Sequence, residues 1–456
     1  MVLIQFFGFF YLTYFIGRGL KVLTCINHKN YVDKYFFGIK ENFFYPIYSL
    51  FFVGNLIVIS NFFVKSSNIF IKIIILLLLL INFMKIEKIK FSIYGIIAYI
   101  LTPAILSIST IGSGLHKDML LYHLNYQNWI NSEKIVIGLT NINGRYGFSS
   151  LHDYISSILW LKGDFILLHY MSITFYFVFF NFLLISLLSK RNDFYLSSLF
   201  ILIFGILDNF GVEGGRNGFL YLEGVGKQDS AFSILFYISN ILLFTSIFNK
   251  NINKNDFLMG SLLVAFSIQL RITGLITLIP LIYYFYLLNK KEIKSTIEKI
   301  KLITPITLIG VMWTIKNILI SGCIIYPVEV TCLTNLNWYI PETALNEAGH
   351  IGKFYNTFSF NESLFDWYKE WSQFSSNYSI SLNFIASLVL IYLFKVLVYK
   401  KEKTSTSVFR RFLPIYILIN FTLWIMNAPA IRLGMGFILL TIGILGIDKH
   451  SYRSNF

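Results

Sequence analysis

Long runs of apolar residues recur from one end of the chain to the other, separated by shorter polar gaps. Residues 73–81 are continuously apolar, and the runs 91–111 and 165–188 approach or exceed the ~20 residues with which a helix crosses a bilayer. A membrane β-barrel would need alternating apolar and polar positions instead. The pattern therefore predicts an all-α, polytopic bundle of transmembrane helices, because helices satisfy their own backbone groups in lipid.

We predict about thirteen spans (eleven to thirteen) in one integral membrane domain over residues 1–456. The run 257–288 is too long for one crossing and has Arg271 at its centre. A charge at the bilayer midplane costs at least ~2.5 kcal/mol, so two short helices are expected to meet at Arg271. The expected spans lie near residues 2–16, 43–64, 69–84, 91–110, 164–188, 194–210, 231–248, 256–270, 273–289, 302–320, 379–398, 412–427 and 433–447.

Composition agrees with this class, since 56% of the residues are hydrophobic and only 13% are charged, against about 25% charged in soluble domains. It excludes a soluble enzyme, a disordered chain and a disulfide scaffold. The net charge is +15, and 24 of the 38 basic residues lie in alternate gaps between apolar runs. Basic loops stay in the cytoplasm, so we expect a plasma (inner) membrane protein whose N-terminus is outside and whose C-terminus is cytoplasmic. The charge then reflects orientation on anionic lipid, and no nucleic-acid partner is expected.

Three outer segments, residues 111–163, 211–229 and 321–378, are far longer than a helical hairpin needs. Long connections of this kind are usually functional or disordered. These contain aromatic and apolar residues throughout, which favours short interfacial helices that pack on the membrane surface. Chemistry is therefore expected on the outer face.

Asp118 is the first candidate for a general base, because it follows the fourth expected span directly. A carboxylate at the membrane interface is partly desolvated yet accessible from outside. The alternative is that Asp118 caps a short helix that begins at Met119.

Further along the same segment, glycines at 144 and 147 flank Arg145 and Tyr146. This spacing allows close approach of a ligand, and Arg145 is suited to bind an anionic group, although a plain glycine turn has the same pattern. Asp153 is a candidate second carboxylate or a support for Arg145; alternatively it is an acid favoured at a helix N-terminus.

The second outer segment has five glycines between Glu213 and Asp229, together with Arg216 and Lys227. The hydrogen-bond donors of this segment suit a phosphate or sugar hydroxyls, although its glycine and lysine spacing is not that of a P-loop. Asp229 fits either a functional role or the start of the next span equally well.

Arg271, Lys316 and Arg432 are cations at the outer membrane level. Such cations snorkel toward water or bind an anion. Snorkelling is expected for Lys316, whereas Arg271 interrupts an apolar run and is better placed to meet a lipid phosphate.

Cys323 and Cys332 lie nine positions apart in the third outer segment, on the side where disulfides form, and are predicted to be bridged. Cys25 falls in an inner gap and is expected to be a free thiol. The histidines have no metal-ligand spacing, so no metal site is expected.

Several motifs resemble a family of largely uncharacterised bacterial multi-pass membrane proteins, which is itself similar to the GT-C glycosyltransferases. The resemblance covers residues 90–345 in patches. The motifs that support it are Asp118-x-x-x-Tyr122-His123, Gly138-Leu139-x-Asn141, Gly144-Arg145-x-Gly147-Phe148, Gly322 to Tyr326-Pro327, and Asn337-Trp338-x-x-Pro341.

The resemblance implies that a sugar passes from a polyprenyl-phosphate carrier to a glycan, lipid or protein acceptor on the non-cytoplasmic face. It implies that Asp118 is the catalytic carboxylate and that cations near the membrane surface hold the carrier phosphate. Many GT-C enzymes have an acidic pair, whereas Asp118 is flanked by Lys117 and Met119, so a divalent cation stays open and no cofactor is assigned.

The candidate phosphate ligands are Arg145, Arg216, Lys227 and Arg271, and the candidate sugar-stacking residues are Tyr122, Tyr146 and Trp338, with His123, Asp153 and Asp229 as further substrate contacts. For each aromatic residue, interfacial anchoring is an alternative role. A transporter or flippase of lipid-linked sugars, or a polymerase or ligase in cell-envelope polysaccharide assembly, would have a similar layout. A channel is disfavoured because the polar residues concentrate in loops.

Overall fold

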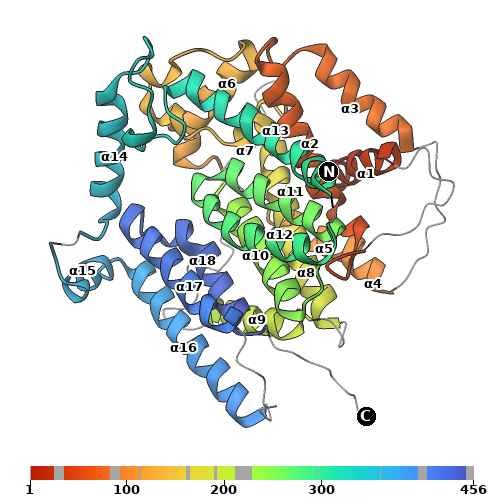
Figure 1. Cartoon of the computed structure of the whole chain (residues 1–456), viewed down its shortest axis with the longest axis vertical. Coiled ribbons are helices and arrows are strands. Elements are labelled where there is room, and N and C mark those ends of the chain that lie inside the picture. The colour runs from red at the N-terminus through yellow and green to blue at the C-terminus, as the bar shows by residue number, and fades with distance from the viewer. Residues whose placement is uncertain are drawn as a thin grey trace.

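The computed structural model describes residues 2–24, 35–82, 93–111, 114–160, 165–188, 193–210, 228–293, 295–359, 361–398 and 408–447. Helices make up nearly all of its regular structure (Figure 1). Within the described ranges the only strands are β1 (Tyr35–Phe36) and β2 (Ile39–Lys40), which form a two-residue antiparallel hairpin. The all-α class expected from the apolar runs is confirmed.

The α-helices are α1 Val2–Thr24, α2 Tyr45–Asn61, α3 Ile69–Ile81, α4 Ile93–Ile96, α5 Thr102–Ile108, α6 Leu124–Ser132, α7 Leu151–Ser157, α8 Ile166–Leu188, α9 Tyr195–Phe210, α10 Asp229–Asn249, α11 Lys254–Leu270, α12 Leu278–Lys291, α13 Thr296–Ser321, α14 Pro341–Tyr355, α15 Leu364–Trp371, α16 Ser375–Val398, α17 Val408–Asn427 and α18 Ile431–Ile444. The 3-10 helices between them are η1 Glu41–Phe44, η5 Leu139–Asn141, η6 Gly144–Phe148, η8 Ile272–Thr277 and η9 Glu329–Thr331. The π-helices are η3 Ile97–Leu101 and η4 Met119–His123.

In the described part of the chain, six helices are long and apolar enough to cross a membrane. They are Glu41–Asn61, Ile166–Leu188, Asp229–Asn249, Ile272–Lys291, Thr296–Ser321 and Ser376–Leu397. Several other expected spans are apolar helices of only 10 to 17 residues, such as α3 and α18. Because helices of that length are short for a complete crossing, the expectation of about thirteen spans is not supported. What holds is a multi-pass helical membrane protein.

Helix α10 forms the centre of the bundle and is buried on every side, from Ala231 to Ile247. It packs against α18, α11 and α8, and a helix that is apolar all round is typical of such a central position. Helices α13 and α16 are exposed over most of their length and display apolar side chains, as expected of the lipid-facing periphery.

The chain breaks at Arg271, as the sequence predicts. Helix α11 ends at Leu270, Arg271 is extended, and the 3-10 turn η8 begins at Ile272. The break brings the Arg271 side chain to the end of α11 instead of leaving it in the middle of a long apolar helix.

Buried polar pairs tie the first helices together. Helix α1 continues beyond the predicted end at residue 16, through Arg18 and Lys21. Arg18 donates to the Asn82 side chain at 3.1 Å, and Lys21 forms an ion pair with Glu41. These partners allow two buried cations to stay within the helix, because each buried charge is paired or hydrogen-bonded.

A second pair joins α2 to α11. Asn55 and Gln269 exchange two amide hydrogen bonds, at 3.1 and 2.8 Å. Both side chains are buried, so the reciprocal contact satisfies groups that would otherwise lack water.

Two of the three predicted outer segments contain short helices. Residues 114–160 include η4, α6 and α7, and residues 321–378 include α14 and α15, which lie at one edge of the bundle (Figure 1). The Cys323 and Cys332 side chains form a disulfide that closes the base of the latter segment. Residues 211–227 of the second segment lie outside the described residues.

Candidate functional site

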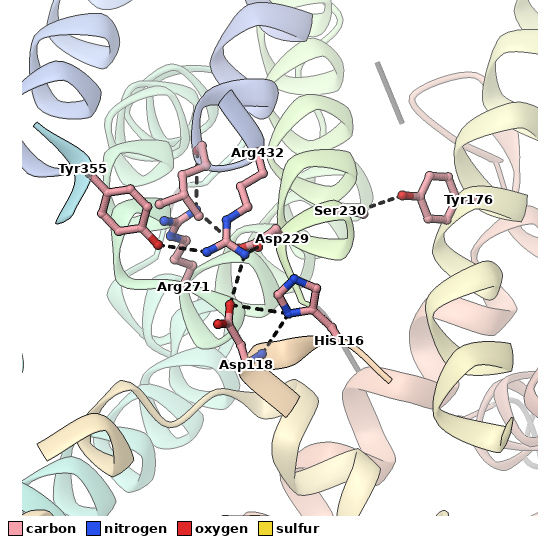
Figure 2. Close-up of polar contacts among 9 residues, drawn as sticks. His116, Asp118, Tyr176, Asp229, Ser230, Arg271, Tyr355 and Arg432 are labelled. Atoms are coloured by element: carbon pink, nitrogen blue, oxygen red, sulfur yellow. Dashed lines mark hydrogen bonds and ion pairs between the residues drawn. The ribbon is translucent and has the colours of Figure 1, made fainter. Parts of the chain in front are cut away.

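A cluster of charged side chains lies where several helices begin or end, and the Arg432 guanidinium is at its centre (Figure 2). Arg432 Nη1 lies 3.1 Å from Asp118 Oδ2 and 3.7 Å from Asp229 Oδ2. Its Nη2 donates to the Tyr355 hydroxyl at 2.8 Å. We refer to Asp118, Asp229, Arg271, Tyr355 and Arg432 as the arginine cluster.

The elements that meet here come from distant parts of the sequence. Asp118 precedes the π-helix η4, and Tyr355 is the last residue of α14. Asp229 and Arg432 lie in the first turns of α10 and α18. Three helical elements, η4, α10 and α18, begin at the cluster, and two, α11 and α14, end there. Their helix dipoles therefore partly oppose one another.

Arg271 completes the cluster from the break after α11. Its Nη1 lies 3.9 Å from Asp229 Oδ1 and donates to the Leu433 carbonyl at 3.4 Å. Its guanidinium carbon lies 5.5 Å from the centre of the Phe232 ring. Two guanidinium groups thus face two carboxylates, and their formal charges balance.

The site is anchored by contacts to its flanking helices. Tyr176 on α8 donates to the Ser230 hydroxyl at 2.5 Å, which fixes the start of α10 next to Asp229 (Figure 2). The Trp371 and Trp424 indoles donate to the carbonyls of Pro429 and Ala430, at 2.7 and 3.0 Å. They hold the short connection after which α18 begins and Arg432 follows.

Asp118 does not use its carboxylate to cap the turn that it precedes. It is the N-cap residue of η4 but makes no side-chain cap hydrogen bond. Instead, its Oδ2 faces Arg432 and lies 3.6 Å from His116 Nδ1, while its own backbone N–H donates to that ring nitrogen at 3.0 Å. The side chains of Asp118 and Arg432 are 23% and 24% exposed, so the pair is accessible to a ligand.

Next to the cluster, His123 and Asp153 form a buried ion pair with Nδ1 and Oδ1 2.9 Å apart. Burial acts to lower the pKa of His123, but the Asp153 charge and hydrogen bond outweigh it, and the pKa is raised above 6.5. For Asp153, burial acts to raise the pKa, yet His123 and the Gln127 amide lower it below 3.8. Both shifts favour the charged pair, with His123 protonated and Asp153 ionised.

The adjacent His152 behaves oppositely. Burial lowers the pKa of His152 to about 4, against a smaller effect of Asp153 in the other direction. His152 is thus neutral where His123 is protonated, because only His123 bonds directly to the carboxylate.

Tyr122 joins the buried pair to the arginine cluster. Its ring lies against the His123 ring, with centroids 4.2 Å apart, and the Arg145 guanidinium lies 5.5 Å from its centre. Burial and then the charge of Asp118 raise the pKa of Tyr122 well above its usual range. The phenol therefore stays protonated and is available as a hydrogen-bond donor.

The structure brings together many of the side chains that the sequence singles out. Asp118, Asp229 and Arg271 belong to the arginine cluster, and Tyr122, His123, Arg145 and Asp153 adjoin it. Asp153 also completes the capping box of α7, with Ser150, so its structural role exists beside the contact with His123.

Other candidates lie elsewhere. Tyr146 is buried and stacks on Tyr126, with ring centroids 5.7 Å apart. Trp338 donates to the Ile318 carbonyl at 3.0 Å and packs over Gly138, so it holds η5 against α13. The contacts described for both residues are with these packing partners and not with the arginine cluster. Arg216 and Lys227 lie outside the described residues, as does Cys25.

Lys316 does not snorkel. Its side chain is fully buried and donates to the Ser149 hydroxyl, which corrects the expectation from its position near a helix end.

The contact of Tyr355 with the cluster has no sequence signal, since Tyr355 ends a polar helix within a long outer segment. Arg432 was recognisable as a cation at the outer membrane level, but not as the partner of Asp118.

Among the described residues, no group of three or more His, Cys, Asp or Glu side chains is placed to hold a metal ion. The cluster instead presents guanidinium donors and a phenol, which suit an oxyanion such as a phosphate.

The fold and this site define a class: a multi-pass helical membrane protein with a charged cluster at the ends of its helices. Residues 1–439 match the family described as Domain of unknown function DUF8201, and the chain belongs to that family. No curated protein and no solved structure matches the chain.

Proposed function

We propose that this protein is a membrane glycosyltransferase that moves a sugar from a polyprenyl-phosphate carrier to a glycan, lipid or protein acceptor, with inversion. The observation that supports it best is the shared guanidinium of Arg432, which contacts both a carboxylate and a phenol at the start of the apolar helix α18. A phosphate can replace these partners, since guanidinium binds phosphate and carboxylate with the same geometry.

In the proposed reaction, the phosphate of the carrier binds Arg432 and Arg271. Arg432 then shares its donors between the phosphate and Asp118, so the Asp118 carboxylate becomes a better base. Asp118 takes the proton of the acceptor hydroxyl as the hydroxyl oxygen bonds to the anomeric carbon. The bond from that carbon to the phosphate oxygen breaks, and the carrier phosphate leaves with the electron pair, stabilised by the two arginines.

Charge balance favours this assignment of roles. The reaction converts a phosphodiester into a phosphate monoester with one more negative charge. When Asp118 takes up the proton, it removes one negative charge from the arginine cluster at the same time. The two arginines can therefore stabilise the additional negative charge on the leaving phosphate without a further cation.

The proposed orientation places the arginine cluster on the non-cytoplasmic side of the plasma membrane, with the N-terminus outside and the C-terminus in the cytoplasm. It rests on the basic residues in the alternate gaps. Residue 118 should then react with labels added from outside, after Asp118→Cys in a chain whose other cysteines are Ser. Labelling only from the cytoplasmic side would reject this orientation.

The test of the reaction is transfer from a radiolabelled undecaprenyl-phosphate hexose or pentose by membranes that contain the protein, with release of undecaprenyl phosphate as the readout. Asp118→Asn should lower the rate roughly 100-fold or more, in the range of general base catalysis. Asp366→Asn is the matched control, because Asp366 is an exposed aspartate on α15.

A flippase for the same lipid would need the arginines but no base. If Asp118→Asn left lipid translocation and glycan assembly intact, Asp118 would not be the base, and transport would be the better assignment.

A further inference from the structure

Ser149 and Lys316 form a second polar contact of chemical interest, outside the arginine cluster. Ser149 lies between η6 and α7, and Lys316 lies on α13. The Lys316 amine and the Ser149 hydroxyl are joined by a hydrogen bond. Serine and lysine side chains in such contact are the components of one kind of activated nucleophile.

The surroundings of the amine are unusual for a lysine. Lys316 is fully buried, and its nitrogen lies 3.5 Å from the centre of the Trp313 ring and 5.5 Å from that of Tyr154. No carboxylate of the described residues lies within ion-pair distance of it. Burying an ammonium group without a directly paired anion is costly, and the aromatic contacts recover only part of that cost.

Ser149 is partly exposed and lies between two residues whose backbone is tightly packed or hydrogen-bonded. A side chain at Gly147 would overlap the Tyr326 ring, with only 2.4 Å to the nearest ring carbon. On the other side, Ser150 begins the capping box of α7. The backbone is therefore constrained on both sides of Ser149, and the Ser149 hydroxyl contacts the buried Lys316 amine.

We propose that Ser149 and Lys316 act as a nucleophile and base that transfer acyl groups from ester donors. The Lys316 amine takes the proton of the Ser149 hydroxyl as Oγ bonds to the ester carbonyl carbon. The bond from that carbon to the alcohol oxygen breaks, and the alcohol leaves with the proton returned by Lys316. A second hydroxyl compound or water then takes the acyl group from Ser149 by the reverse steps. This activity is separate from glycosyl transfer and does not use Asp118.

The test is covalent labelling of the purified full-length protein in detergent with a fluorophosphonate carrying a fluorescent group. Its phosphorus reacts with activated serines, and fluoride leaves. We expect the label on Ser149 by peptide mapping, and none on Ser149→Ala. Lys316→Met should lower the labelling rate about 100-fold or more. Ser321→Ala, which changes a buried serine on the same helix as Lys316, is the control and should label at the wild-type rate.

Lys316→Arg separates a base from a merely structural lysine. Arginine keeps donors for Ser149 and contact with Trp313 but does not accept a proton. It should fold, as judged by size-exclusion elution, and yet label as slowly as Lys316→Met. Absence of labelling in the wild-type protein, labelling at another serine, or wild-type rates in Lys316→Arg would each overturn the proposal. None of these results depends on the sugar donor.

Discussion

Replacing Asp153 by Asn tests whether the buried pair with His123 stabilises the outer segment. The change keeps the size of the side chain and removes its charge. Asp153 Oδ1 accepts from Gln127 at 3.1 Å and lies 2.9 Å from His123, and Oδ2 accepts from the Ser150 backbone at 3.4 Å. An asparagine amide must turn its NH₂ group toward at least one of these donors. The variant therefore loses both an ion pair and a hydrogen bond.

Breaking a buried ion pair by removing one partner typically costs about 3 to 5 kcal/mol. The loss should depend on pH. The pKa of Asp153 is depressed, so its contribution is fully present above 3.8 and is lost as pH falls through the folded value. The pKa of His123 is raised, so its contribution is fully present below 6.5 and is lost as pH rises through the folded value. Both contributions are complete only between these limits.

Equilibrium unfolding in mixed micelles, at pH 5.5 and at pH 8.5, measures the difference between wild type and Asp153→Asn. We expect a larger difference at pH 5.5, because His123 contributes there and not after it deprotonates. Asp366→Asn, at an exposed position of α15, should show little change at either pH, since an amide oxygen can still accept from the Ser363 hydroxyl. An equal difference at both pH values would refute the assigned protonation of His123, and no difference would refute the stabilising role of the pair.

Three further changes probe the packing. Gly17→Ala places a Cβ 1.9 Å from the Tyr45 carbonyl oxygen and should lower the free energy of unfolding by about 1 to 3 kcal/mol or more. Gly8→Ala is the control and should leave that free energy unchanged, because a Cβ at Gly8 meets nothing within 4 Å. Equal effects of the two changes would contradict the close contact between α1 and α2. Asn55→Leu and Gln269→Leu should each lower the free energy of unfolding by about 1 kcal/mol, and a double-mutant cycle should show that the double variant loses less than the sum. Strict additivity would mean that the two amides are not coupled. Cys323→Ser with Cys332→Ser should destabilise the third outer segment by about 3 kcal/mol or less and speed its proteolysis; unchanged cleavage would show that the bridge does not constrain it.

The sequence predicts features that depend on neighbours along the chain. The helical class follows from apolar runs, and the break at Arg271 follows from the cost of a charge within such a run. The bridge between Cys323 and Cys332 was suggested by their short separation on one side of the membrane. The expectation of about thirteen spans is too high, because an apolar helix of 10 to 17 residues satisfies the same pattern whether or not it crosses a bilayer.

Contacts between distant segments were not predictable in the same way. Asp118 could be recognised as a candidate by its place after a span. Its pairing with Arg432, 314 positions away, depends on how α18 packs against α10. Tyr355 ends a polar helix whose position relative to α18 is set by tertiary packing. The aromatic residues Tyr146 and Trp338 suited sugar stacking by type alone, and only their packing partners distinguish a structural role.

Because Asp118 and Arg432 are far apart in the sequence, Asp118 is synthesised well before its partner Arg432. At roughly 5 to 20 residues per second, the ribosome needs about 15 to 60 seconds after Asp118 to reach Arg432. Until then the nascent chain has its early aspartate without the cation that balances it in the finished protein. Assembly of the cluster therefore has to wait for α18, and a chain that is released before α18 has every other residue of the cluster but not the arginine that joins them.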